Sequence, residues 1–147
     1  MKEKVTHKQI DRKEKGQSLV ELALTITLVL TLLAGIVDLG SAFFSYVSLR
    51  DAAQEGALYG SLNPIDTTGI RNRIRQSSNA PIDFVNDPNF QVPVVTISGS
   101  ACTGGAITVS LTYNYQLSMP FIGAILGTDT IPLTASVTDT ILNPKCP

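Results

Sequence analysis

The sequence predicts an α+β protein with a long N-terminal transmembrane helix that continues into a small domain with a short second helix and a three- to four-stranded antiparallel sheet. Two observations carry this prediction. An uncharged apolar run of membrane-crossing length lies between Glu21 and Asp38. Apolar and polar residues alternate strictly along two C-terminal stretches. The 147 residues are enough for one ordinary domain besides the long helix.

Charged residues are distributed unevenly along the chain. Residues 1–16 hold six Lys or Arg against three Asp or Glu, a formal charge of +3, whereas the remainder holds five against nine, a formal charge of −4. A mildly acidic body is not suited to neutralising phosphates, so nucleic acid is not an expected partner. The basic leader before the apolar run predicts a single-pass protein of the cell (inner) membrane, with a cytoplasmic N-terminus and an extracytoplasmic C-terminal domain.

The apolar run has the length of a membrane span. In a helix that starts at Gln17 and rises about 1.5 Å per residue, Glu21 would lie roughly 6 Å and Asp38 roughly 32 Å along the axis. Both carboxylates would then lie near opposite faces of a hydrocarbon layer about 30 Å thick. Two simpler interpretations stay open: an uncleaved anchor, and a secretory signal cleaved after residues 40–42 to release a body that starts at Phe43.

A short motif lies where the basic leader meets the apolar run. Gly16 ends the leader, Gln17 follows it, and Glu21 stands fifth after the glycine. This arrangement resembles the processing site of type IV prepilins, in which a membrane peptidase cuts after the glycine and the new N-terminal residue is usually methylated. The resemblance implies that Gly16 and Gln17 flank the cut. In that family the glutamate meets the N-terminal amine of a neighbouring subunit, which gives Glu21 a role in assembly.

Three blocks of sequence narrow this resemblance. Residues 16–24 (GQSLVELAL), 35–40 (GIVDLG) and 52–57 (AAQEGA) are similar to the TadE-like family of tight-adherence pilus proteins. The resemblance implies a pilin-like fold and the role of a minor pseudopilin, a non-catalytic structural component of a Tad/Flp-type pilus or a related secretion apparatus. Asp38, in the second block, is expected to contribute to assembly together with Glu21.

The family resemblance also implies partners. These are a prepilin peptidase, other pilins and pseudopilins, an inner-membrane assembly platform with its cytoplasmic ATPase, and membrane lipid. No cofactor and no small-molecule substrate is expected. The alternative class is a single-pass, membrane-anchored binding or adhesion module that never enters a filament, and the mature N-terminus discriminates between the two.

The long helix is expected to continue beyond the apolar run to about Gly60, because good helix formers follow and Pro64 is the first proline. The predicted organisation is a prepilin-type leader (1–16), a transmembrane and extended helix (17–60), and an extracytoplasmic α+β domain (61–147). Small residues at spacings of three and four form one face near the end of the helix: Ala52, Ala53, Gly56, Ala57 and Gly60. That face can pack on the chain's own sheet or on another subunit.

A short second helix is expected over residues 70–76, capped by Thr67 or Thr68. Its Ile70 and Ile74, four residues apart, would face inward. Three arginines alternate along this helix and are expected to form a solvated or salt-bridged surface: Arg71, Arg73 and Arg75.

The last third of the chain predicts β-structure. Residues 92–98, 107–117 and 131–138 have the character of half-buried strands. Pro93 favours an edge position or the beginning of its strand, and residues 99–105 would form the turn between the first two strands. The apolar face of this sheet needs a cover, which the extramembrane part of the long helix can supply.

The loop from Ser118 to Thr130 joins the two most regular strands. Its 13 residues are many for a simple hairpin, and it is unusually apolar. Either the loop folds back over the sheet as a short helix, or it presents an apolar surface to another subunit or to the membrane. We expect that part of it forms an interface through Phe121, Ile122, Ile125 and Leu126.

The chain has two cysteines, Cys102 and Cys146, both in the predicted extracytoplasmic body. In a non-cytosolic space one intramolecular disulfide is favoured, with free thiols or an intersubunit bond as alternatives. The disulfide would close a loop of about 45 residues, worth on the order of 4 kcal/mol. A zinc site is not expected, because the only histidine, His7, lies in the leader.

Enzymatic function is not expected from the residue types present. Removal of the leader leaves no histidine to act as a general base. The sequence contains no phosphate-binding or calcium-binding loop motif. Asp83 and Asp87 could be taken for paired acids, but they are expected to shape a loop before the first strand.

Overall fold

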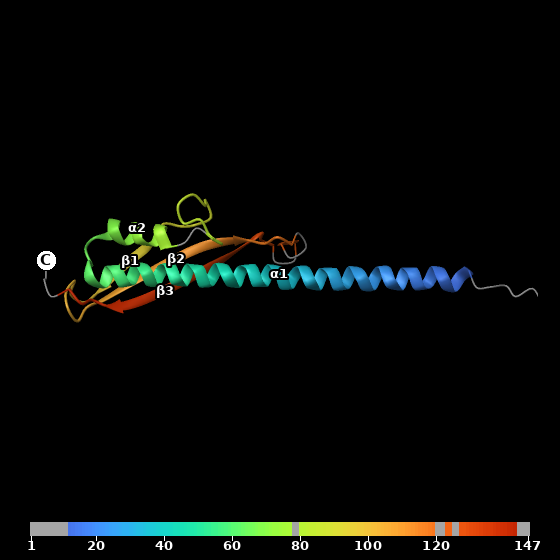
Figure 1. Cartoon of the computed structure of the whole chain (residues 1–147), viewed down its shortest axis with the longest axis horizontal. Coiled ribbons are helices and arrows are strands. Elements are labelled where there is room, and N and C mark those ends of the chain that lie inside the picture. Colours follow the sequence, from blue (N-terminus) through green and yellow to red (C-terminus); the bar gives the residue numbers. More distant parts are fainter. Residues whose placement is uncertain (1–11, 78–79, 120–122, 125–126, 144–147) are drawn as a thin grey trace, which may run out of the picture. The chain divides into compact units, whose positions relative to one another are not determined.

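The architecture is two helices followed by three strands (Figure 1). The computed structural model describes residues 12–77, 80–119, 123–124 and 127–143. The elements are α1 (Arg12–Leu62), α2 (Thr67–Ser77), β1 (Val94–Ser98), β2 (Ala106–Gln116) and β3 (Thr130–Thr140). The predicted α+β class is confirmed, with one long helix, one short helix and a three-stranded antiparallel sheet.

The chain forms two compact units, the first ending at Val37 and the second beginning at Asp38. In the first unit, every residue from Gly16 to Val37 is exposed except Gly35, which is half-buried. A helix that is apolar on all sides suits a lipid environment better than water. This N-terminal helix is long and apolar enough to cross a membrane.

Polar side chains within the apolar helix are satisfied locally. The hydroxyls of Thr25, Thr27 and Thr31 each donate to the carbonyl oxygen four residues earlier, at 2.8 Å. Such bonds remove the cost of placing a free hydroxyl donor in hydrocarbon, where no water can accept it. The threonines are therefore compatible with a membrane span.

The second unit contains an antiparallel sheet with the strand order β1-β2-β3. Val95 pairs with Val109, and Val109 pairs with Val137. The alternation seen in the sequence therefore places apolar residues of all three strands on one face. On the central strand, Ile107, Val109 and Leu111 are fully buried.

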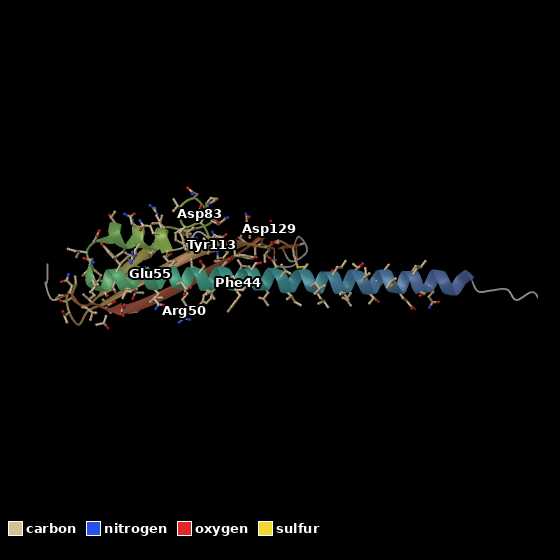
Figure 2. The ribbon with its side chains drawn as sticks, viewed as in Figure 1. Phe44, Arg50, Glu55, Asp83, Tyr113 and Asp129 are labelled. Carbon is tan, nitrogen blue, oxygen red and sulfur yellow. The ribbon has the colours of Figure 1, made fainter. Side chains whose placement is uncertain are left out.

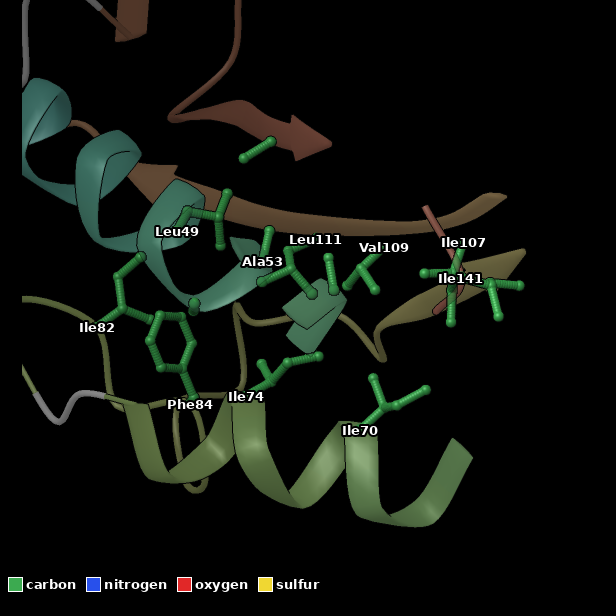
Figure 3. Close-up of a cluster of buried hydrophobic side chains, with 13 residues drawn as sticks. Leu49, Ala53, Ile70, Ile74, Ile82, Phe84, Ile107, Val109, Leu111 and Ile141 are labelled. Atoms are coloured by element: carbon green, nitrogen blue, oxygen red, sulfur yellow. The ribbon is translucent and has the colours of Figure 1, made fainter. Parts of the chain in front are cut away.

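Both helices contribute to the core that covers this face. Leu49 and Ala53 of α1, Ile70 and Ile74 of α2, and Ile107 of β2 belong to one buried cluster (Figure 3). Full burial of a large aliphatic side chain contributes about 1.5–3 kcal/mol. The sheet therefore depends on α1 and α2 for its stability.

The face of small residues on α1 packs inside the chain. A Cβ added at Gly56 would lie 2.7 Å from Cγ1 of Ile74, and one added at Gly60 would lie 2.6 Å from Cδ1 of Ile107. Both distances are too short for a carbon contact, so these positions require glycine if the isoleucines are to keep their places. The neighbouring alanines are buried as well: Ala52, Ala53 and Ala57. Packing of this face on the chain's own domain is confirmed.

The cap of α2 differs from the prediction. Oδ1 of Asp66 accepts a hydrogen bond from the backbone N–H of Gly69 at 2.9 Å, whereas Thr67 and Thr68 already lie within the helix. A carboxylate that precedes the first turn accepts a hydrogen bond from a free N–H. Its negative charge also interacts favourably with the positive end of the helix dipole. The buried face, Ile70 and Ile74, is as predicted.

The arginines of α2 lie on the surface, as predicted. Arg71, Arg73 and Arg75 are all exposed. Nε of Arg73 lies 3.4 Å from Oε2 of Glu55, and both side chains are about half exposed. Exposed ion pairs contribute little to stability, on the order of 0.2–1 kcal/mol.

Strand bounds shift slightly from their predicted positions. β1 begins at Val94 rather than residue 92, since Pro93 has no N–H for the ladder. β3 extends to Thr140, which pairs with Ala106. The predicted turn over residues 99–105 contains two glycines with positive φ, 83° at Gly99 and 95° at Gly104. Such a backbone conformation favours glycine.

Candidate functional site: two carboxylates on the long helix

The predicted processing junction lies on an exposed part of α1. Gly16, Gln17 and Glu21 are all exposed, and a Cβ added at Gly16 would meet nothing within 4 Å. Nε2 of Gln17 donates to Oε1 of Glu21 at 3.3 Å. The described part of the chain has a single ion pair, between Arg73 and Glu55, so Glu21 has no cationic partner there.

Asp38 has very different surroundings. Only 5% of it is exposed, and Oδ1 accepts a hydrogen bond from the Tyr115 hydroxyl at 2.9 Å. The backbone N–H of Ser118 lies 3.2 Å from both carboxylate oxygens. Asp38 therefore links the first turn of the second unit to the end of β2.

The Tyr115 hydroxyl is held as a donor in this cluster. Burial raises the pKa of Tyr115 above its ordinary value, and the hydrogen bond to Asp38 and the charge of that carboxylate raise it further. The hydroxyls of Ser41 and Ser118 act in the opposite direction. A phenol that resists ionisation beside a carboxylate is suited to fixing structure rather than to transferring protons.

The sequence did not identify Tyr115 or Ser118 as partners of Asp38. Two signals were present. An aspartate between apolar residues of a membrane-length helix needs a partner, and a tyrosine at an inward position of a strand needs an acceptor for its hydroxyl. The two residues are separated by 77 positions, so only the folded chain brings them together. An assembly role for Asp38 stays a prediction beside this intramolecular one.

The acidic residues before β1 shape a loop, as predicted. Oδ1 of Asp83 accepts hydrogen bonds from the N–H groups of Val85 at 2.9 Å and Asn86 at 3.1 Å. The side-chain amide of Asn86 and these N–H groups hold the pKa of Asp83 below its ordinary value. Both contacts are typical of an Asx turn.

Asp87 connects this loop to the sheet. Its Oδ1 accepts from the N–H of Asn89 at 2.9 Å, and its Oδ2 accepts from the hydroxyl of Tyr113 at 3.0 Å. Figure 2 labels Asp83 and Tyr113 in this part of the molecule. Asp83 and Asp87 thus have separate structural partners.

The interface of the β2–β3 loop stays a prediction, and its residues lie outside the described part of the chain: Phe121, Ile122, Ile125 and Leu126. The described neighbours show how the loop is closed. Met119 is buried, with 9% exposed. The N–H of Leu117 donates to the carbonyl oxygen of Asp129 at 3.0 Å, and that of Gly127 donates to Gly123 at 2.9 Å.

Cys102 lies in the turn between β1 and β2, half-buried. The next residue, Thr103, donates its backbone N–H to the carbonyl oxygen of Asn143 at 2.9 Å. Cys146 lies outside the described residues, so the Cys102–Cys146 disulfide stays a prediction. Within the described ranges there is no group of three His, Cys, Asp or Glu residues placed to hold a metal ion.

A groove in the described structure has a volume of about 650 Å³. It lies in the second unit, beside one face of α1 and the segment that follows α2, and its lining includes Phe44, Val47, Asp51, Glu55 and Pro81. It combines apolar surface with two carboxylates and contains no His or Cys. Nothing in this lining forms a nucleophile and base pair.

These features define a class of protein: an α+β domain that follows an apolar helix of membrane-spanning length. The family model described as TadE-like protein matches residues 16–58. The match confirms the resemblance over the segment that starts at Gly16 and contains both Glu21 and Asp38. No curated protein matches the chain, and no solved structure matches it.

Proposed function

We propose that this protein is a TadE-like minor pseudopilin, a non-catalytic structural component in the assembly of a Tad/Flp-type pilus or a related secretion apparatus. The observation that carries the proposal is the TadE-like match over residues 16–58, which begins at the glycine of the candidate processing junction. The exposed apolar helix from Gly16 to Val37 supports it. Its partners are a prepilin peptidase, other pilins and pseudopilins, an inner-membrane platform and lipid.

Glu21 gives the assembly step a physical reason. An ionised carboxylate in hydrocarbon costs about 2.5–3.5 kcal/mol at mid-membrane and less near an edge. The described part of this chain offers Glu21 only a side-chain amide, Nε2 of Gln17 at 3.3 Å. Cleavage after Gly16 would create a cationic amine on Gln17 of each subunit. Pairing of Glu21 with that amine on a neighbour would offset the cost and favour association.

The membrane orientation follows from the charge distribution. The leader carries a formal +3 and the remainder −4, so we place the N-terminus in the cytoplasm and the second unit outside. An extracytoplasmic location favours a disulfide between Cys102 and Cys146. The hydrogen bond from Thr103 to Asn143 supports this pairing, because it holds the turn of Cys102 beside the segment that leads to Cys146.

The experiment that tests this function is mass determination of the protein from its native membrane. We expect a mature chain that starts at Gln17, with or without a methyl group on its amine. A start at Met1 would favour an uncleaved anchored module, and a start at Phe43 would favour a secretory signal; either result would contradict the pseudopilin.

Two glycine variants sharpen this test. Gly16→Ala should retain the leader, because the peptidase requires the glycine. Gly40→Ala is the matched control, since an added Cβ meets nothing within 4 Å at either glycine. The control should be processed like the wild type, which would separate loss of recognition from a general effect of alanine in α1.

A further inference from the structure

One face of α1 is exposed where the helix enters the second unit. Leu39, Phe43, Tyr46 and Arg50 follow one another at spacings of four, three and four, which places them on one side of a helix. Leu39 is 73% exposed, Phe43 61% and Tyr46 38%. Arg50 is also exposed. An apolar, then amphipathic, then cationic order of side chains along one face is typical of a helix that leaves a membrane.

Phe44 widens this surface. It is 66% exposed, and its ring packs edge to face against Phe43 with the centroids 6.2 Å apart. Figure 2 shows Phe44 and Arg50 on α1. Contiguous exposed apolar side chains mark a contact surface, whereas scattered ones do not.

Asp38 would be expected to stop lipid contact before this surface is reached. It lies between Val37, 68% exposed, and Leu39, 73% exposed. Its own side chain is withdrawn, however, with 5% exposed and hydrogen bonds from Tyr115 and Ser118. A carboxylate that is enclosed and hydrogen-bonded by its own domain does not have to be solvated by water, so the helix can remain in lipid past this position.

The length of the helix agrees with this placement. About 20 helical residues cross a hydrocarbon layer of about 30 Å, and the headgroup regions add roughly 5–7 Å on each side. Counted from Glu21, the hydrocarbon would end at about residue 41, and the headgroup region at about residue 45. Tyr46 and Arg50 then come at and just beyond the lipid phosphates.

We propose that the lipid-contacting surface of this protein extends beyond Val37 into the folded domain, as far as Tyr46. Leu39 contacts acyl chains of the outer leaflet. The rings of Phe43 and Phe44 reach back towards the acyl chains from the headgroup region, because helical side chains point towards the N-terminus, and Arg50 contacts phosphate groups. The proposal rests on the membrane anchoring assumed in the proposed function, but not on filament assembly.

Phospholipid fits this surface better than a second copy of the chain does. Helices that associate within a membrane do so through small side chains that allow the backbones to approach closely. Leu39, Phe43 and Tyr46 are large. The small-residue face near the end of α1 is not free to receive a second copy, because Gly56 and Gly60 are already covered by Ile74 and Ile107.

The chain has no tryptophan, so single tryptophans can report on lipid contact. We would reconstitute the full-length variants Leu30→Trp, Leu39→Trp, Phe43→Trp and Leu58→Trp into phosphatidylcholine vesicles that contain acyl-brominated lipid. All four side chains are exposed in the wild type, by 55–73%, so none of the replacements disturbs the core. We expect the bromine to quench the first three and to leave the emission of Leu58→Trp unchanged.

Each other outcome has a defined meaning. Quenching of Leu30→Trp alone would overturn the proposal and leave the membrane anchor intact. Absence of quenching at all positions would overturn both the proposal and the anchor. Blue-shifted but unquenched emission from Phe43→Trp would show that protein, not lipid, covers the face, and would also overturn the proposal. The mass of the mature chain tests the pseudopilin independently of these results.

Discussion

Glu21 and Asp38 are carboxylates on the same helix, yet their surroundings are opposite. Glu21 is exposed on an apolar segment, and its carboxylate accepts a hydrogen bond from one side-chain amide, that of Gln17, at 3.3 Å. Asp38 is almost fully enclosed and accepts hydrogen bonds from Tyr115 and from the backbone of Ser118. A carboxylate in apolar surroundings must be stabilised by some partner. The fold supplies that partner for Asp38, whereas the described chain offers the Glu21 carboxylate only the side-chain amide of Gln17.

This difference separates two tasks that the sequence motif places close together. Asp38 stabilises the attachment of the sheet to the helix, so its loss should be seen in the isolated protein. The Glu21 carboxylate accepts only one exposed hydrogen bond within the described chain, from Gln17, so we expect its loss to be seen only when subunits meet. Single substitutions at the two carboxylates and their partners can test that division.

Glu21→Leu should abolish assembly while leaving the isolated protein as stable as the wild type. Removing the charge from an apolar helix favours membrane insertion, but a neighbouring amine then lacks its counter-ion. Pilus output and co-purification with partner pseudopilins are the measurements. Thr25→Val, one turn further along the exposed helix, is the control and should assemble. Normal pilus output from Glu21→Leu would contradict the pairing.

Asp38→Leu should destabilise the folded domain by about 3 kcal/mol, because it leaves the Tyr115 hydroxyl and the Ser118 N–H without an acceptor. Thermal melting of the full chain in detergent, followed by circular dichroism, measures the effect. Asp51→Leu is a suitable control, since Asp51 is an exposed carboxylate on the same helix. If Asp38→Leu melted at the wild-type temperature, the enclosed carboxylate would have no structural role.

Tyr115→Phe should cost less, about 1 kcal/mol, since Asp38 keeps the Ser118 N–H and loses only the hydroxyl donor. Tyr46→Phe, at an exposed tyrosine of α1, should have no measurable effect in the same melting experiment. The cluster also predicts that Tyr115→Phe adds little to Asp38→Leu, because both variants remove the same hydrogen bond. Additive losses would show that the two residues act independently.

Tyr113 should give the smallest effect, visible only at alkaline pH. Burial, together with the hydrogen bond to Asp87 and its charge, raises the pKa of Tyr113 from 10.0 to about 12. Because the folded-state pKa is the higher one, this tyrosine contributes stability that is present below about pH 10 and lost as the pH rises towards 12.

The difference in phenolate absorbance between wild type and Tyr113→Phe, followed against pH, measures this titration. Between pH 10 and 12 the wild type should lose melting temperature more steeply than the variant does. Ionisation of Tyr113 at its ordinary pKa would show that the hydrogen bond to Asp87 does not stabilise the neutral phenol.

The sequence determined those features that depend on local pattern. Apolar residues on every side of residues 16–37 define a helix suited to lipid, because a helix of that composition has no polar face to present to water. Alternation with a period of two defined the inward residues of β2 and β3. Pro64 predicted that α1 ends at about Gly60, and the structure places its end at Leu62.

Only the tertiary structure decided features that depend on residues far apart in the chain. The sequence allowed the face of small residues on α1 to pack on the chain's own sheet or on another subunit. In the structure this face packs within the chain, with Ile74 against Gly56 and Ile107 against Gly60. Asp66, and not Thr67 or Thr68, caps α2, because its carboxylate accepts a hydrogen bond from the backbone N–H of Gly69. The glycine contacts join elements far apart in the chain and cannot be derived from a one-dimensional pattern, whereas the cap is local, and an Asp just before the helix was a signal that the prediction missed.

The two carboxylates show most clearly what a sequence pattern leaves undetermined. Spacing along the chain predicts that Glu21 and Asp38 lie near the two faces of a membrane, and both are acidic residues in an apolar helix. What separates them is a tyrosine 77 positions away from Asp38. Periodicity reports the direction in which a side chain points, whereas the partner that it meets depends on how the sheet closes onto the helix.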